Sequence, residues 1–133
     1  MWMHNGVVSS FSLIKRRLIN RLSDYTFSLL QGTTDSEHCF VLYLQCFFEL
    51  RNKASGRTDS YALDDGEEAD PEMLRDAMLN VIQLINQWLE EAEVSERSLM
   101  NFAGTATNPH SRHKAINRSI DPSIHRPDSR LID

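Results

Sequence analysis

Hydrophobic and polar positions divide the chain into three segments with helical spacing, followed by a stretch without a clear period. In the first segment, apolar side chains recur at steps of three and four from Phe11 to Leu29, which places them on one face of a helix. Ser9 or Ser10 can cap its start, and Gly32 can end it. The pattern predicts a continuous helix over residues 11–29.

The second segment is almost entirely apolar. It opens with a capping-box pattern over residues 34–37, in which the Thr34 hydroxyl accepts from an amide three residues on and the Glu37 carboxylate reaches back. Residues 39–48 then contain one polar side chain, Gln45. A short buried strand is the competing interpretation, but the cap and the length favour a helix. A surface helix keeps a solvated face, so this helix must be covered on nearly all sides, by its own domain or by a second molecule.

The third segment has the strongest helical signal. Asp70 can act as the cap, and Pro71 suits the first helical position because its missing donor would be unpaired there anyway. Apolar residues follow at steps of four and three, namely Leu74, Met78, Val81, Ile85, Trp88 and Ala92. Further apolar neighbours widen this stripe, which suits a bundle core better than a two-stranded coiled coil. Near Ser95 the helix can break and restart before Gly104.

These segments predict an all-α fold, a small helical bundle of three main helices plus a short fourth, with an extended C-terminal tail. The bundle occupies residues 1–104, and 133 residues suffice for one hydrophobic core. Residues 105–133 hold three of the four prolines and isolated aliphatic side chains, typical of a tail that is flexible or docked on a partner.

Several features predict a cytoplasmic protein. No apolar run approaches the roughly 20 residues that a membrane-spanning helix needs. Basic residues near the start follow the first apolar stretch instead of preceding it, the reverse of a secretory signal. Cys39 and Cys46 are seven residues apart on the expected second helix, too far for a mutual disulfide, and buried thiols suit a reducing compartment.

Charge is distributed unevenly around a net value of −5. Residues 1–22 carry no acid and hold four basic side chains that could contact nucleic-acid phosphates, namely Lys15, Arg16, Arg17 and Arg21. The acidic residues in the middle of the chain would repel the nucleic-acid backbone unless they face away from it. A solvated helix face with internal ion pairs explains the same residues.

Catalytic and metal-binding patterns are weak. His38 and Cys39 are adjacent, and neighbouring helical side chains diverge by roughly 100°. His110 and His113 have a spacing compatible with zinc, but their proline-containing segment offers no rigid shell. The acidic run that starts at Asp59 fails the calcium-loop spacing. We therefore expect no enzyme, no cofactor and no metal.

The covered second helix makes a partner the main expectation. It predicts a non-catalytic protein–protein interaction module, a small helical adaptor, chaperone-like or regulatory protein, acting as a homodimer or assembly subunit. The expected interface residues are Phe40, Tyr43, Phe47, Phe48 and Trp88. The alternative is a nucleic-acid-associated regulatory protein that uses the basic first helix and the tail.

Overall fold

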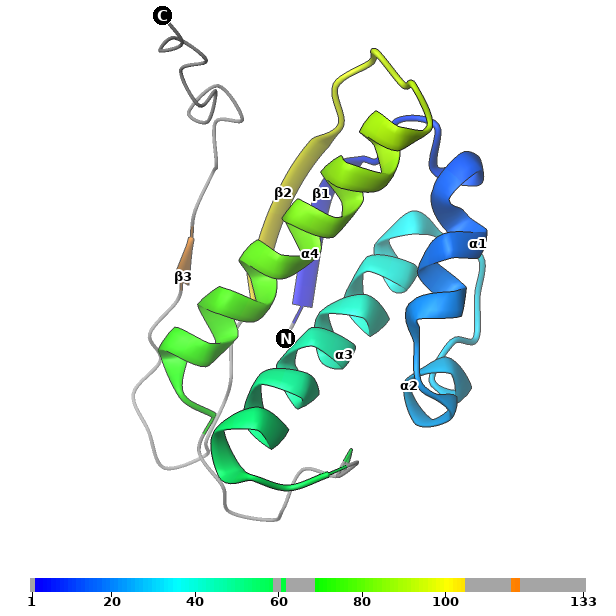
Figure 1. The fold of residues 1–133 in the computed structure, drawn as a ribbon. Coiled ribbons are helices and arrows are strands. Elements are labelled where there is room, and N and C mark those ends of the chain that lie inside the picture. The colour runs from blue at the N-terminus through cyan, green and yellow to red at the C-terminus, as the bar shows by residue number, and fades with distance from the viewer. Residues whose placement is uncertain (1, 59–60, 62–68, 105–115, 118–133) are drawn as a thin grey trace, which may run out of the picture.

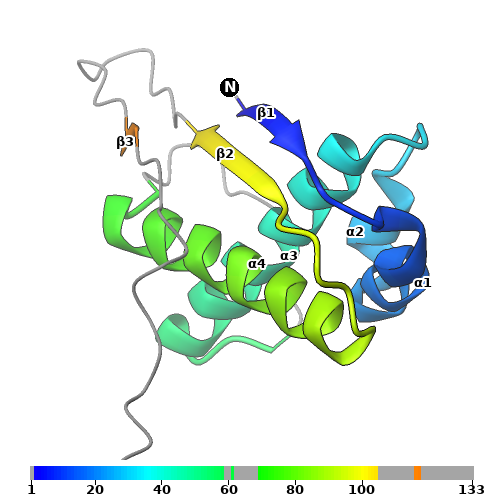
Figure 2. The same cartoon turned by 90° about the horizontal axis from the view of Figure 1, so that it is seen from above.

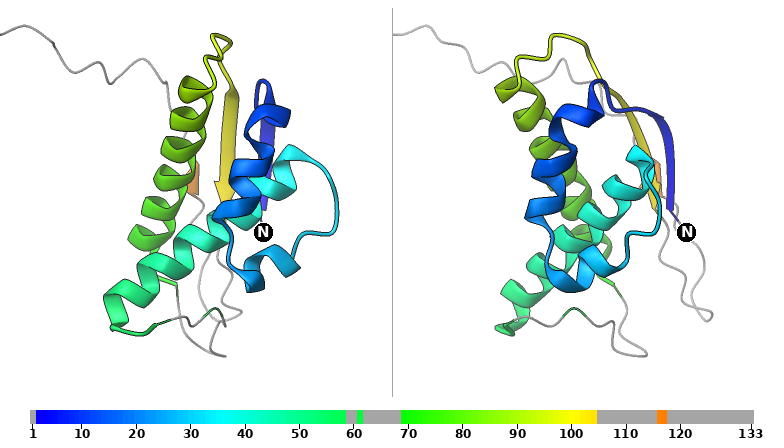
Figure 3. Two further views of the ribbon diagram at one scale, coloured as in Figure 1. Left: turned by 45° about the vertical axis from the view of Figure 1, so that its right-hand side comes forward. Right: turned by 90° about the vertical axis from the view of Figure 1, so that its right-hand side faces the viewer.

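Two layers make up the fold: a group of helices and a small antiparallel sheet on one side of it (Figures 1 and 3). The computed structural model describes residues 2–58, 61, 69–104 and 116–117. In chain order, the elements are β1 (Trp2–Val7), α1 (Phe11–Arg21), α2 (Asp24–Ser28), α3 (Asp35–Ser55), α4 (Pro71–Glu91), β2 (Leu99–Gly104) and β3 (Ile116–Asn117). The described chain is mostly helical, which confirms the prediction of a small helical fold.

The first helical segment is two helices instead of one. The chain turns extended at Leu22, and the Ser23 hydroxyl caps α2 by accepting from the Thr26 amide. Gln45 of α3 accepts from the Ser23 amide at 3.0 Å and from the Thr26 hydroxyl at 2.6 Å. The apolar stripe continues across this break, so spacing alone could not reveal it.

Helix α3 forms where the second segment predicted it, so the strand alternative is wrong. The Thr34 hydroxyl accepts from the Glu37 amide at 3.3 Å, as expected of the cap. The Glu37 carboxylate instead accepts from the Gln31 and Gly32 amides, at 2.7 and 2.9 Å. The cap thereby also closes the loop that leads from α2 into α3.

Helix α4 begins as predicted. The Asp70 side chain accepts from the Glu72 amide at 3.0 Å, and Pro71 is the first helical residue. Ala77, Val81 and Ile85 are fully buried on the face toward α3, and the two helices form the most extensive helix pair of the fold.

The sheet is the feature that the sequence pattern missed. Residues 99–104, expected near a short fourth helix, form β2 and pair antiparallel with β1, from Trp2 opposite Gly104 to Val7 opposite Leu99. Two residues of the predicted tail, Ile116 and Asn117, pair with the other edge of β2. Figure 2 shows β1 and β2 lying over one side of the helices, more than 90 residues apart in the sequence yet adjacent in space.

Helix α3 is covered by the chain itself, which corrects the predicted interface. Its core side chains pack with those of α1, α4 and the sheet. Four of the five expected interface residues are buried there: Tyr43, Phe47, Phe48 and Trp88. Phe40 is partly exposed. The prediction underestimated the surface that two strands and the additional helix α2 can cover.

Some predictions concern residues outside the described ranges. They are most of the calcium-loop comparison (residues 59–60 and 62–68), the histidines at 110 and 113, and most of the tail that begins at residue 105. Across the part of the chain that is described, no helix has both the length and the apolar character required to cross a bilayer.

Candidate functional site

A polar cluster lies where the N-terminus of α3 meets β1. It consists of His4 from β1 and of Asp35 and Ser36 from the first turn of α3, all three partly exposed. Backbone amides point out of a helix N-terminus, and the helix dipole makes this end positive. We define these three residues as the β1–α3 cluster.

His4 and Ser36 form a direct hydrogen bond across 32 residues of sequence. The His4 Nδ1 and Ser36 Oγ atoms lie 2.7 Å apart. The other ring nitrogen of His4, Nε2, is buried and has no hydrogen-bond partner among the described residues. The imidazole also packs against the Phe102 ring of β2, with centroids 4.7 Å apart. Contacts from β2 and α3 thus fix the orientation of the ring.

Asp35 connects the segment that follows β1 to the start of α3 through hydrogen bonds. One carboxylate oxygen accepts from the Val8 amide at 3.1 Å, and the other accepts from the Ser36 amide at 2.8 Å. A carboxylate at the positive end of a helix is favourable in its own right. Both oxygens are therefore engaged with the backbone, and neither is bonded to His4.

The second histidine of the region is structural. His38 is 2% exposed, and its Nδ1 atom lies 2.7 Å from the Thr34 carbonyl oxygen. Its ring makes an edge contact with Phe11 of α1, with centroids 5.3 Å apart. His38 thereby fastens α1 to the start of α3.

The two thiols are poorly suited to act as nucleophiles. Cys39 and Cys46 are buried in the core and are free of disulfides. Burial raises the pKa of Cys39 to about 12 and that of Cys46 to about 12. The thiolate is the reactive species of cysteine, and at neutral pH it is scarcely populated in either residue.

The chemistry open to the β1–α3 cluster follows from this geometry. A hydroxyl within hydrogen-bond reach of an imidazole resembles a nucleophile beside its base, but such pairs need a third group to orient the base. Here His4 Nε2 lacks that group among the described residues, and the Asp35 oxygens serve the backbone. The cluster can donate and accept hydrogen bonds to a polar ligand. The residues described contain no group of three or more metal-binding side chains.

The four basic residues of α1 fall into two pairs. Arg17 bonds to Glu91 of α4, and Arg21 makes a two-pronged ion pair with Glu49 of α3, with both distances 2.6 Å. The Glu49 hydrogen bond is the main factor that raises the pKa of Arg21. These two arginines therefore form ion pairs that connect α1 to α4 and to α3.

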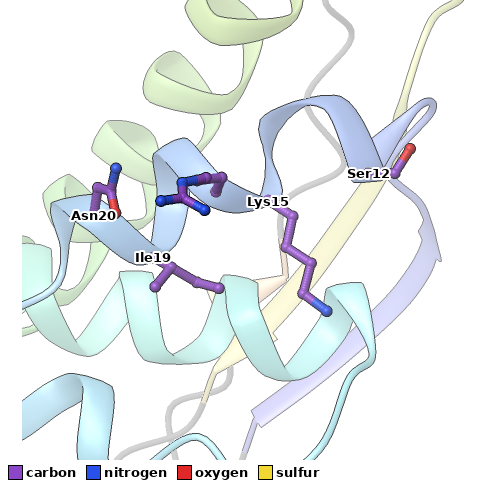
Figure 4. Close-up of a pocket in the computed structure, with 5 residues that line it drawn as sticks. Ser12, Lys15, Ile19 and Asn20 are labelled. Carbon is purple, nitrogen blue, oxygen red and sulfur yellow. The ribbon is translucent and has the colours of Figure 1, made fainter.

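Lys15 is partly exposed and Arg16 is exposed. They line a shallow surface hollow together with Ser12, Ile19 and Asn20 (Figure 4). Of the four residues expected to contact phosphates, two therefore line the surface hollow, Lys15 and Arg16. Binding of nucleic acid there stays a prediction.

Sequence reasoning missed the β1–α3 cluster for a specific reason. Asp35 and Ser36 were seen only as part of a helix cap, and His4 lay outside every periodic segment. The pairing of β1 with β2 and its contact with α3 bring them together. The polar pair His4 and Asn5 in an otherwise apolar start was the available signal.

Comparison with known proteins identifies a similar curated protein of Saccharomyces cerevisiae, named "Probable glutamine amidotransferase DUG3". The two are 38% identical over 108 residues. The alignment covers 78% of this chain and 28% of the yeast protein, so the chain spans less than a third of the relative's length. No family model and no solved structure matches the chain.

This similarity overturns the expectation of a non-catalytic adaptor or chaperone-like protein. Most of the chain aligns with a protein named as an enzyme, so the predictions of an adaptor and of no enzymatic role are wrong. The absence of a local catalytic motif misled the sequence reasoning. Sites are assembled from residues distant in sequence, as the 32-residue separation of His4 and Ser36 illustrates.

Proposed function

We propose that this chain is part of a glutamine amidotransferase, an enzyme that takes nitrogen from the side-chain amide of glutamine. The observation that carries the proposal is the 38% identity over 108 residues to the yeast protein of that name. The chain aligns with 28% of the relative. The activity and the substrate are therefore proposed for the whole enzyme of which this chain is a part.

Within that enzyme, we assign the β1–α3 cluster a role in holding the glutamine amide. A carboxamide presents a carbonyl acceptor and an NH₂ donor, and the Ser36 hydroxyl can both donate and accept. The His4 imidazole is close enough to share a proton with Ser36, at 2.7 Å. The chemistry is therefore matched to a neutral amide.

The cluster is assigned to binding and positioning, not to nucleophilic attack. Burial raises the pKa of both Cys39 and Cys46 to about 12, which disfavours their thiolates. The His4–Ser36 pair lacks an orienting carboxylate among the described residues. The attacking group is expected elsewhere in the enzyme.

A chimera tests this function directly. The aligned segment of the yeast protein is replaced by this chain, and release of glutamate from glutamine is measured. We expect the chimera to release glutamate, because the two segments are 38% identical over 108 residues. A chimera that melts cooperatively but releases no glutamate would refute the proposed function.

The same chimera tests the role of the cluster. Ser36→Ala is expected to raise KM about tenfold, the effect of losing one hydrogen bond to substrate. Ser28→Ala is the matched control, because its exposed hydroxyl bonds only to the Tyr25 carbonyl of its own helix. Equal kinetics for the two variants would remove the cluster from substrate binding.

We also propose a cytoplasmic location. The buried Cys39 and Cys46 are both free thiols, which suits a reducing compartment. Fluorescent tagging and cell fractionation measure it, and recovery in a secreted or lumenal fraction would contradict it.

A further inference from the structure

The two ring nitrogens of His4 have different surroundings. Nδ1 lies 2.7 Å from the Ser36 hydroxyl oxygen, whereas Nε2 is buried and has no hydrogen-bond partner among the described residues. A Cβ atom built at Gly6 would lie 3.5 Å from Nε2, so the backbone of β1 is close to this nitrogen. The imidazole is stacked on the Phe102 ring at an interplanar angle of 30°. A hydrogen on Nε2 would lie in the plane of the imidazole and so would not point into the face of Phe102.

These surroundings select the position of the ring hydrogen. A neutral imidazole carries one hydrogen, on Nδ1 or on Nε2. A hydrogen on Nε2 would be a buried donor without an acceptor. Among backbone groups, orphaned buried N–H donors are rarer than under-used acceptors, and we apply the same order to the ring. A doubly protonated ring would have the same orphaned donor and a partly buried charge in addition. The single hydrogen therefore belongs on Nδ1, where the Ser36 oxygen accepts it.

The Ser36 hydroxyl then has its own hydrogen to donate. If Nδ1 is the donor, the hydroxyl oxygen is the acceptor and its hydrogen must point away from His4. Ser36 is partly exposed, and its hydroxyl has no second hydrogen-bond partner among the described residues. The amides of Ser36 and Glu37 already donate to Asp35 and Thr34. The hydroxyl is therefore available to a ligand as a donor, whereas these two amides are engaged.

We propose that His4 is a positioning residue, which donates its Nδ1 hydrogen to Ser36 and thereby turns the Ser36 hydroxyl toward the carbonyl oxygen of the bound glutamine carboxamide. This inference rests on the proposed amidotransferase function and adds a direction to it, since Ser36 donates and the substrate accepts. A hydroxyl that donates binds the carbonyl oxygen of a carboxamide and not its NH₂ group. The nitrogen that is to be transferred is then left without a contact to Ser36.

Nuclear magnetic resonance of the full chain tests the position of the hydrogen without reference to catalysis. Long-range correlation of ring hydrogens with ring nitrogens, in protein labelled with nitrogen-15 histidine, distinguishes the two neutral forms and the doubly protonated ring. The loss of signals in His4→Asn identifies those of His4. Near neutral pH we expect a neutral His4 with its hydrogen on Nδ1. A hydrogen on Nε2, or on both nitrogens, would overturn the proposal whatever the enzyme does.

The chimera with the yeast protein tests whether His4 acts through Ser36. His4→Phe keeps a ring against Phe102 but removes the donor. It is expected to raise KM for glutamine about tenfold with kcat nearly unchanged, as Ser36→Ala does. The double variant should be no worse than either single variant, because the two residues act as one unit. His4→Asn keeps a donor near the Nδ1 position and should recover most of the binding.

The outcomes separate this proposal from the function on which it rests. A wild-type chimera that releases no glutamate refutes the function, and with it the substrate contact, while the resonance experiment still decides the His4–Ser36 hydrogen bond. With glutamate release intact, an unchanged KM in His4→Phe overturns the role of His4 alone. Effects that multiply to about a hundredfold in the double variant also overturn it, because independent residues behave in that way. If His4→Phe fails to fold, the hydrogen position in the wild type remains decisive.

Discussion

At the scale of single residues, Gly6 decides whether the two long strands can pair. A Cβ atom built at Gly6 would lie 1.9 Å from the Leu99 carbonyl oxygen, and the obstructing atom is backbone. No rotamer change can relieve such an overlap. The close approach of β1 to β2 therefore requires glycine at this position.

Replacing Gly6 with Ala is expected to lower the free energy of unfolding by about 2–4 kcal/mol, because β1 must move away from β2. Gly56→Ala is the control, since Gly56 has a φ of 66° but nothing within 4 Å of the added atom. That change should cost only about 1 kcal/mol. Urea unfolding monitored by circular dichroism measures both variants, and equal losses would contradict the steric argument.

At the scale of elements, a small polar network holds α2 against α3. Gln45, 3% exposed, accepts from Ser23 and Thr26 and donates to Glu49 at 2.8 Å. Thr26 is itself fully buried. The network therefore joins α2 to α3 through buried polar contacts.

Gln45→Met should therefore weaken the attachment of α2 to α3 while leaving α4 in place. The substitution keeps the volume of the side chain but removes the oxygen that accepts from both the Ser23 amide and the buried Thr26 hydroxyl, which keeps its contact with the Ser23 carbonyl oxygen at 3.2 Å. The lost hydrogen bonds should cost about 1–3 kcal/mol. Faster amide hydrogen exchange in α2 than in α4 is the expected signature. Gln87→Met removes only an exposed bond to Glu91 and serves as the control. Uniform acceleration in both helices would refute a local role.

The α3–α4 pair is the apolar counterpart of that network. Ile85 and Leu42 are fully buried between these helices and their neighbours. Ile85→Ala is expected to cost about 2–5 kcal/mol, through lost burial and a residual cavity. Leu79→Ala, on the exposed side of α4, should cost less than about 1 kcal/mol. Thermal melts of the two variants measure the difference, and similar melting temperatures would contradict the assignment of Ile85 to the core.

At the scale of the whole molecule, ion pairs between helices make stability depend on pH. Burial alone would raise the pKa of Glu49, but the hydrogen bonds from Arg21 and Gln45 together hold it below the ordinary value of 4.5. A carboxyl whose pKa is lowered by folding stabilises the fold above its unfolded pKa. The stabilisation is lost as the pH falls through the lower folded value.

Wild type should therefore melt a few degrees higher than Glu49→Gln at pH 7, and the two melting temperatures should converge toward pH 3. The neutral amide keeps the shape of the side chain and removes its charge. Glu90→Gln, on an exposed position of α4, is the control and should show no such convergence. A gap that stays constant from pH 7 to pH 3 would exclude the ionised carboxylate as its source.

The outcome of the sequence reasoning differs between helices and strands for a physical reason. Helix caps and helical spacing are local, so Thr34, Asp70 and Pro71 marked the starts of α3 and α4 correctly. Strand pairing is not local, because β2 depends on a partner more than 90 residues away. Residues 99–102 alternate between more exposed and more buried positions only because β2 lies beside β1 in the folded chain.

The amino-acid sequence by itself determined a mostly helical chain, the two long helices with their caps, and a central helix too apolar to face water. Tertiary structure alone decided that this helix is covered within one chain, that the first segment breaks at Ser23, and that His4 meets Ser36. Local hydrogen bonds and side-chain periodicity depend on residues that are neighbours in the sequence. The sheet and the β1–α3 cluster instead arise from contacts between residues distant in sequence, whose proximity only the folded chain establishes.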